Sequence, residues 1–167
     1  MNPMREIRVE KITLNIGAGK DERMMKKAEI LLKKLSPVAP IKTTAKKRLP
    51  AWGLRPGLPI GMKATVRDGA EELLQRLLKA KTMKLNAKSF TKDGQLAFGV
   101  AEYIDVPGLE YDPELKIMGF EVAVSLARPG YRVQRRRLSK AKVGANHKVS
   151  KEDAIAFMQE KYGVTVE

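Results

Sequence analysis

The sequence predicts an α+β fold, in which an antiparallel or mixed sheet carries helices on one face and extended basic loops project from it. Apolar and polar residues alternate in segments 7–16, 59–67 and 120–126, as they do in strands with one buried face. Apolar residues recur at helical spacing in 22–35, 70–79 and 151–162. The strands lie in an order that favours antiparallel pairing with the helices gathered on one side. At 167 residues we expect one domain spanning 1–167.

The first strand has an apolar and a polar face. Its apolar face holds Ile12, Leu14 and Ile16, and its polar face holds Lys11, Thr13 and Asn15. Ile7 and Val9 are out of phase with the apolar set, so we expect a bulge or a strand start near Glu10. A short strand is expected at 41–44, and the strand at 59–67 alternates an apolar set with Lys63, Thr65 and Arg67.

Each helix carries start and stop signals. The first should bury Met24, Ala28, Leu31, Leu32 and Leu35 and end at Ser36-Pro37. Asp68 is the expected carboxylate cap of the second, which buries Leu73, Leu74, Leu77 and Leu78. Ser150 to Asp153 resembles a capping box for the last helix, which Gly163 ends. Between the second and the last helix, residues 81–92 are expected to be irregular. Asp93-Gly94 predicts a turn into a short strand at 96–100.

The charge balance points to a polyanionic partner. Lys and Arg total 33 against 19 acids, for a net charge of +14, which favours nucleic acid first and an anionic membrane surface second. No apolar run reaches the roughly 20 residues that span a bilayer, and no signal-peptide block is present. With no cysteine in the chain, a cytoplasmic protein is expected.

Two segments concentrate the positive charge. No acid occurs between Glu29 and Asp68 or between Glu121 and Glu152. The first of these stretches contains residues 46–58, rich in Gly and Pro, which we call the first basic arm. Its middle should not be helical, and its only tryptophan, Trp52, is as well suited to core packing as to exposed contact. The second stretch contains residues 128–149, the second basic loop, where Tyr131 could stack on a base.

Catalysis has little support in the sequence. Gly17-Ala18-Gly19-Lys20 lacks both the earlier glycine and the following hydroxyl of a phosphate loop, so it predicts a tight turn whose amides could still approach a phosphate. His147 is the only histidine, so neither a metal site nor a catalytic triad is expected. We therefore expect no enzyme, no metal and no cofactor.

Four stretches together resemble one family. RVEKITLNIGAG, PGLPIGMKATVR, AKSFTKDGQLAFGVAEYI and the GLEYDP loop are similar to the universal large-subunit ribosomal protein five, a 5S-rRNA-binding family, over about residues 4–163. RPGYRVQRRR followed by KVGANHKVSKEDAI resembles its archaeal and eukaryotic branch. The resemblance implies a structural constituent of the large subunit at the central protuberance, with 5S rRNA, large-subunit rRNA, peptidyl-site tRNA, a small-subunit head protein and neighbouring 5S-binding proteins as partners, and no membrane.

The resemblance also implies three sets of contact residues. The 5S rRNA face comprises Lys11, Thr13, Asn15, Lys63, Thr65 and Arg67. The loop toward the tRNA comprises Lys47, Arg48, Trp52, Gly53, Leu54 and Arg55. The loop toward rRNA or the small subunit comprises Arg128, Tyr131, Arg132, Arg135, Arg136, Arg137, Lys140, Lys142, His147 and Lys148.

Two alternatives remain open from the residues alone. A free-standing basic RNA chaperone or rRNA-processing factor would share the same charge and bind many RNAs about equally. A phosphoryl-transfer or hydrolytic enzyme would use the turn at Lys20 and would bind ATP or GTP.

Overall fold

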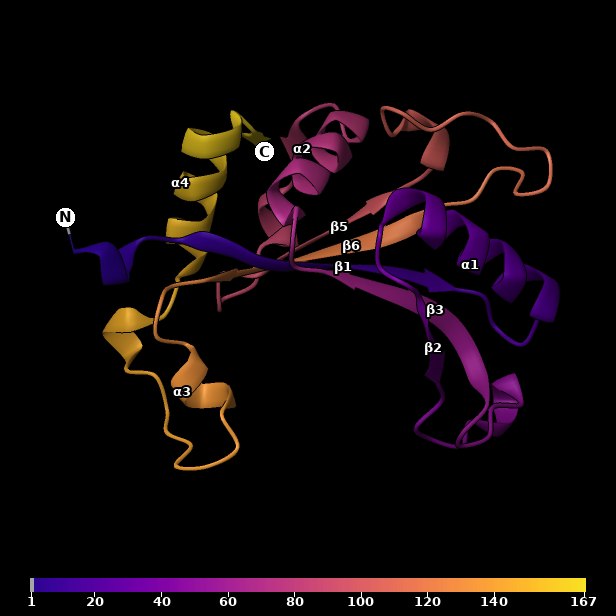
Figure 1. The fold of residues 1–167 in the computed structure, drawn as a ribbon, viewed down its shortest axis with the longest axis horizontal. Coiled ribbons are helices and arrows are strands. Elements are labelled where there is room, and N and C mark those ends of the chain that lie inside the picture. The colour runs from indigo at the N-terminus through magenta and orange to yellow at the C-terminus, as the bar shows by residue number, and fades with distance from the viewer. Residues whose placement is uncertain (1) are drawn as a thin grey trace.

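The computed structural model describes residues 2–167 and is built on a five-stranded sheet in the order β2-β3-β1-β6-β5. All four neighbouring pairs are antiparallel. The strands are β1 (Arg8–Gly17), β2 (Ile41–Thr44), β3 (Pro59–Val66), β5 (Leu96–Val100) and β6 (Phe120–Ala127). Helices α1 (Glu22–Leu35), α2 (Ala70–Ala80) and α4 (Lys151–Tyr162) all cover one face (Figure 1). The α+β prediction with helices on one face is confirmed.

The central strand β1 decides which side chains reach the core. Ile12, Leu14 and Ile16 are buried, and the residues between them lie on the opposite, uncovered surface, which we call the free face. The pairing of β1 with β6 shifts between Val9 and Lys11, so the bulge predicted near Glu10 is confirmed. The bulge moves the start of the strand into a new phase without disturbing its buried half.

Helix α1 begins and ends where its signals predict. The Asp21 side chain accepts a hydrogen bond from the Arg23 amide at 2.8 Å, and Ser36 is the C-cap. One expected core residue is wrong, because Met25 is buried while Met24 is 36% exposed. The helix packs on β3, so its orientation about its own axis decides which of the two neighbouring methionines faces the core.

Helix α2 packs on β1 through the predicted leucines, but its predicted cap is wrong. The N-cap is Gly69, which has φ of 72° and provides no side-chain hydrogen bond, in place of Asp68. A left-handed conformation at that position is available to glycine at little cost. Helix α4 has the predicted capping box, formed by Ser150 and Asp153, and the predicted left-handed Gly163 at its end.

The remaining elements are short. The two-residue strands β4 (Lys84–Leu85) and β7 (Thr165–Val166) pair in parallel and tie the C-terminus to the segment predicted as irregular. Helix α3 (Arg132–Arg135) lies in the second basic loop. Single 3-10 turns occupy Pro3–Arg5, Pro50–Trp52, Ala87–Ser89, Tyr103–Asp105 and Ala145–His147. No helix in residues 2–167 is long and apolar enough to cross a membrane.

Candidate nucleic-acid interface

The free face brings together most of the side chains predicted to contact 5S rRNA. Thr13 lies opposite Thr65, and Asn15 lies opposite Lys63, across the β1–β3 pair. Lys11 follows along β1, where it pairs with Ser125 of β6. Arg67 lies one residue beyond the end of β3. These positions form a polar surface in the middle of the sheet, with hydroxyl and amide groups in the centre and cations around them.

An acid on this surface was not among the predicted contacts. Glu121 of β6 lies opposite Asn15, and the Asn15 Nδ2 donates a hydrogen bond to the Glu121 Oε2 at 3.1 Å. A carboxylate only accepts, so the bond orients the amide with its nitrogen toward Glu121 and its oxygen available for a donor. Strand alternation places Glu121 on the polar side of β6, but only the register between strands shows that it meets Asn15.

The other half of the free face is lined by very small residues. Ala97 and Gly99 of β5 and Ala123 of β6 are exposed there, and Ala97 pairs with Ala123. They lie beside Thr13 and Asn15 in one shallow hollow. Apart from Glu121, which also lines this hollow, the side chains here are short, so a flat or ribose-lined surface can approach the backbone closely. The sheet therefore offers a smooth area next to a hydrogen-bonding one.

The first basic arm is a closed loop of its own. Its root is held by the Ala45 amide, which donates to the Leu58 carbonyl at 2.8 Å, and its tip by reciprocal bonds between Leu49 and Leu54. A single 3-10 turn at Pro50–Trp52 carries Trp52 outward, where 70% of its surface is exposed. The prediction that the middle is not helical is wrong for this one turn, and core packing of Trp52 is excluded. All the predicted contact residues of the arm are exposed except Leu54, which is half-buried: Lys47, Arg48, Trp52, Gly53, Leu54 and Arg55.

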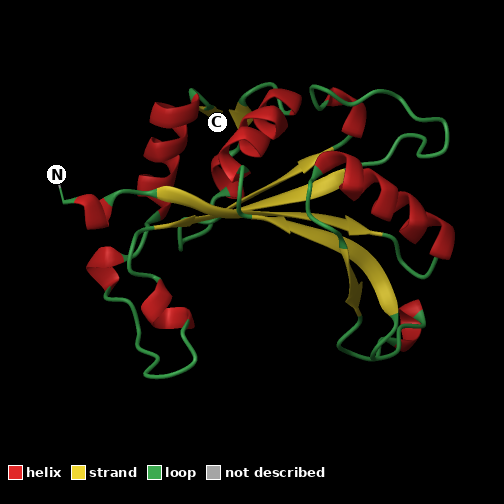
Figure 2. Cartoon of the chain, viewed as in Figure 1, coloured by secondary structure: helices red, strands yellow, loops and turns green. Residues whose placement is uncertain are grey.

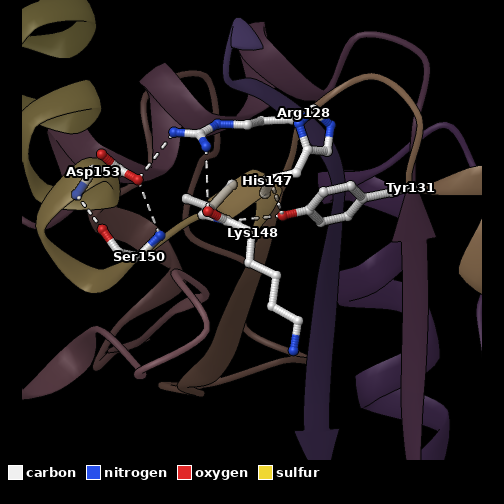
Figure 3. A network of polar contacts seen from close by, with 7 residues as sticks. Arg128, Tyr131, His147, Lys148, Ser150 and Asp153 are labelled. Carbon is white, nitrogen blue, oxygen red and sulfur yellow. Dashed lines mark hydrogen bonds and ion pairs between the residues drawn. The ribbon is translucent and has the colours of Figure 1, made fainter. Parts of the chain in front are cut away.

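The second basic loop is fastened to the body at its root (Figure 3). Arg128, whose side chain is 11% exposed, donates to the Asp153 Oδ2 at 3.0 Å and to the Lys148 carbonyl at 3.3 Å. The Val149 amide donates to the Tyr131 hydroxyl at 2.8 Å. The His147 Nε2 lies 2.8 Å from the Pro129 carbonyl oxygen. Three residues predicted to contact RNA, Arg128, Tyr131 and His147, therefore have structural partners within the protein.

Asp153 is the acid that neutralises the root of the second basic loop. Its carboxylate accepts from the Ser150 backbone amide and lies beside the Arg128 guanidinium, and these contacts hold the pKa of Asp153 below its ordinary value of 3.8. The Arg128 Nε is buried without a hydrogen-bond partner in the described part of the chain. Asp153 thus serves two purposes, since it completes the capping box of α4 and neutralises the arginine at the loop's base.

The rest of the second basic loop faces solvent. Its exposed cations are Arg132, Arg135, Arg136, Arg137, Lys140, Lys142 and Lys148. Only Arg135 among them forms an ion pair within residues 2–167, with Glu10 of β1. Both the second basic loop and the first basic arm project on the side of the sheet opposite α1, α2 and α4, at its two ends (Figures 1 and 2). The free face is therefore flanked by cations at either end.

The glycine turn after β1 has no free amides at its centre. The amides of Ala18 and Gly19 both donate to the Ile60 carbonyl, at 3.1 and 3.0 Å. The expectation that these amides could approach a phosphate is therefore wrong. The Lys20 ammonium lies against Gly53 of the first basic arm, in the space that a Cβ on that glycine would occupy. Within residues 2–167 no group of three or more metal-binding side chains occurs.

One further surface was missed by sequence reasoning. The loop between β5 and β6, residues 101–119, carries the acids Glu102, Asp105, Glu110, Asp112 and Glu114. Asp112 pairs with Lys34 of α1 at 2.6 Å, and the contact holds the pKa of Asp112 below its ordinary value. Tyr111 and Ile117 are 58% and 67% exposed on the same loop. The density of acids in so basic a chain was a signal in the sequence.

A polar sheet face flanked by two acid-free basic segments, with no catalytic constellation in the described residues, defines an RNA-binding protein of the ribonucleoprotein class. Comparison with known families agrees. Residues 2–55 match the model described as ribosomal protein L5, and residues 59–160 match the model that describes the C-terminus of the same ribosomal family. The chain therefore belongs to the ribosomal protein L5 family. It is an rRNA-binding protein of the large ribosomal subunit, a cytoplasmic ribosome component that serves translation and is not an enzyme.

Archaeal proteins are among the similar ones, in keeping with the archaeal and eukaryotic branch that the resemblance implied. The chain is 50% identical to the large ribosomal subunit protein uL5 of Nanoarchaeum equitans, over 99% of this chain and 98% of that one. It is 45% identical to the protein of the same name from Sulfurisphaera tokodaii, covering 99% and 95%, and 46% identical to that of Archaeoglobus fulgidus, covering 99% and 93%. The expected family and branch are confirmed.

Proposed function

We propose that the free face binds 5S rRNA and that the flanking basic segments bind large-subunit rRNA, so that the protein anchors 5S rRNA at the central protuberance. The observation that carries this proposal is the placement of Thr13, Thr65 and Asn15 side by side between two acid-free segments. Cations supply affinity through phosphates with little regard to sequence, while hydroxyl and amide groups set register on ribose and base edges. The chain acts as a single domain, because one apolar core draws on residues from both family matches.

Competition binding tests the sheet as the specific site. The purified protein is bound to 5S rRNA in about 0.2 M salt with excess tRNA, since dilute buffer lets so basic a chain bind any RNA. We expect 5S rRNA to be retained, and Asn15→Ala with Thr65→Ala to weaken it roughly 30-fold, from two hydrogen bonds of about 1 kcal/mol each. Gln75→Ala with Gln159→Ala, on the exposed helical side, is the matched control and should change nothing.

The same assay decides between this proposal and a free-standing RNA chaperone or processing factor. A chaperone would bind 5S rRNA and tRNA about equally and would not sediment with ribosomes. If the two RNAs compete equally, charge alone accounts for RNA binding, and a specific 5S rRNA site on the sheet is refuted.

The first basic arm is proposed to reach the peptidyl-site tRNA. Support comes from its self-closed tip, which presents the exposed Trp52 among Lys47, Arg48 and Arg55. An exposed aromatic ring among cations suits a nucleic-acid surface. Lys47→Ala with Arg48→Ala and Arg55→Ala should weaken tRNA binding by assembled ribosomes while leaving 5S rRNA affinity within about twofold. An equal loss of both affinities would assign the arm to rRNA.

The small-subunit contact is proposed for the acidic loop, and the second basic loop is assigned to rRNA phosphates. Seven of the fifteen exposed residues of the second basic loop are cationic and none is acidic, whereas the loop at 101–119 combines acids with the exposed Tyr111 and Ile117. An acidic surface with apolar residues fits a basic protein partner, such as one in the small-subunit head or a neighbouring 5S-binding protein. Glu110→Lys with Glu114→Lys should weaken subunit joining and spare 5S rRNA binding. The opposite result would return the contact to the second basic loop.

A further inference from the structure

A pocket lies where the second basic loop meets the free face. Its walls come from four segments of the chain: Lys11 of β1, Gln95 after the turn at Gly94, Ser125 of β6, and Tyr131 and Gln134 of the loop. It encloses about 320 Å³, near the lower end of the roughly 300–1,000 Å³ of small-molecule sites. None of the three sets of predicted contacts describes this pocket, although Lys11, Tyr131, Arg135 and Lys148 of those sets are among its residues.

The walls of the pocket are fixed before any ligand arrives. The Gln95 Nε2 donates to the carbonyls of Asp93 and Leu126, both at 3.2 Å. Since only the amide nitrogen can donate to these two carbonyls, the Gln95 Oε1 is left as the free acceptor. The Tyr131 ring is held through its hydroxyl by the Val149 amide and lies edge-on to His147 at 6.0 Å. A prearranged acceptor and a fixed aromatic ring therefore share one pocket.

The two acids in the lining make the interior of the pocket a poor site for a phosphate. Glu10 and Asp93 are part of the lining, and Arg135 is already paired with Glu10. A phosphate placed there would compete with the Glu10 carboxylate for Arg135 and would be repelled by Asp93. Lys11 and Lys148, which form no ion pair within residues 2–167, also line the pocket and suit the phosphates of a strand that passes over it. The interior suits a neutral planar group that donates and accepts hydrogen bonds.

We propose that this pocket receives one unpaired base, turned out of the RNA that lies on the free face. The inference rests on the proposed function and deepens it. A base inserted there places its ring near Tyr131 and a donor, such as an exocyclic amine or ring N–H, toward the Gln95 Oε1. Gln134 and Ser125 supply further hydrogen-bonding groups. Recognition of an extruded base by its hydrogen-bonding edge and by an aromatic neighbour is a general mode of single-strand binding.

Base-specific chemical probing tests the proposal. The full chain is bound to a transcript of its own 5S rRNA in about 0.2 M salt, and reagents that modify unpaired Watson–Crick edges report each base. Ser125→Leu fills the pocket from the sheet, and Gln134→Trp fills it from the exposed loop. Gln159→Trp, exposed on α4 on the helical side, is the matched control. We expect one base to be protected by the wild type and the control, and to react in both pocket-filled variants while the other protections remain.

Affinity gives an independent readout. Filling the pocket should weaken binding by roughly 5- to 150-fold, the usual value of one stacked base. Replacing the protected nucleotide with an abasic one should weaken the wild type by the same factor and leave the pocket-filled variants unchanged, because the two changes remove the same contact. If one variant fails to fold, the other variant and the abasic RNA decide.

The outcomes separate this inference from the proposed function. A wild type that prefers 5S rRNA but yields one footprint for all four proteins refutes the pocket and keeps the sheet site. Unchanged affinity for the abasic RNA refutes the pocket in the same way. A wild type that binds 5S rRNA no better than tRNA refutes the proposed function, and the pocket inference with it.

Discussion

Replacing Asp153 by alanine should be among the most destabilising single changes on the surface of the protein. The Asp153 carboxylate accepts from the Ser150 amide in the capping box of α4 and from the Arg128 guanidinium at the root of the second basic loop. The substitution removes both contacts together. It also leaves Arg128, 11% exposed, with only the Lys148 carbonyl as a partner.

The magnitude follows from the two contacts. Loss of the capping-box hydrogen bond from the Ser150 amide to Asp153 costs about 1 kcal/mol. Breaking a fully buried ion pair costs about 3–5 kcal/mol. Because Asp153 is 41% exposed and water screens its charge, we expect the loss of the Arg128–Asp153 pair to cost about 2 kcal/mol. The sum is about 3 kcal/mol, or roughly 6–12 °C in Tm for a chain of this size. Arg128→Met removes the buried charge itself and leaves Asp153, which is 41% exposed and still accepts from the Ser150 amide, so it should cost only about 1 kcal/mol.

Urea unfolding followed by circular dichroism measures these differences. Glu152→Ala, the exposed neighbour in the same turn of α4, is the control and should stay within about 0.5 kcal/mol of the wild type. The double variant Arg128→Met with Asp153→Ala should be more stable than Asp153→Ala alone, because the stranded charge is gone. A double variant less stable than Asp153→Ala, or a loss below about 1 kcal/mol for that single change, would refute the reasoning.

Three further outcomes are expected. Gly61→Ala should cost about 1–3 kcal/mol in urea unfolding, because its Cβ would stand 2.6 Å from the Ile16 carbonyl oxygen, whereas Gly17→Ala meets nothing within 4 Å and should be neutral. The stability gap between the wild type and Asp153→Ala should shrink as pH falls below about 4, since the pKa of Asp153 is lowered in the folded state, chiefly by the Ser150 amide; a constant gap from about pH 7 to about pH 3 would contradict this. Amides of residues 47–58 should exchange with solvent faster than the Val149 amide, because so charged and Gly/Pro-rich a segment has little apolar surface to hold it; strong protection across the first basic arm would contradict this.

The elements of the fold could be predicted wherever one local pattern decides them. Alternation determines which side of β1 and β3 is buried, and helix α1 is bounded by Asp21 and by Ser36-Pro37. Errors arose where the pattern allows two neighbouring choices. Helical spacing does not separate Met24 from Met25 in a first turn, and the capping rule recognises Asp68 by type without knowing the conformation of Gly69.

The candidate site could be predicted only as faces and segments. Which side chains share the free face follows from alternation, but the contact of Asn15 with Glu121 depends on a register between residues 106 apart. The pairing of Arg128 with Asp153 is equally invisible, because it needs the path of the whole second basic loop. The same holds for β4 and β7, each too short to show a period. Long-range pairing is what a single sequence leaves open.

The positive charge of the second basic loop is partly neutralised by acids of the protein, whereas that of the first basic arm is not neutralised within residues 2–167, and this difference affects how each segment binds RNA. The second basic loop has no acid of its own, but acids from elsewhere neutralise it near its base: Asp153 of α4 meets Arg128, and Glu10 of β1 meets Arg135. Arg136, Arg137, Lys140 and Lys142, which form no ion pair in the part of the chain that the structure describes, belong to a loop whose root is already oriented, which lowers the ordering cost of binding. The first basic arm has backbone bonds at its root and tip but no ion pair within the described residues. Its cations repel one another without compensation, so an RNA that supplies the missing charge should order this arm more than it orders the second basic loop.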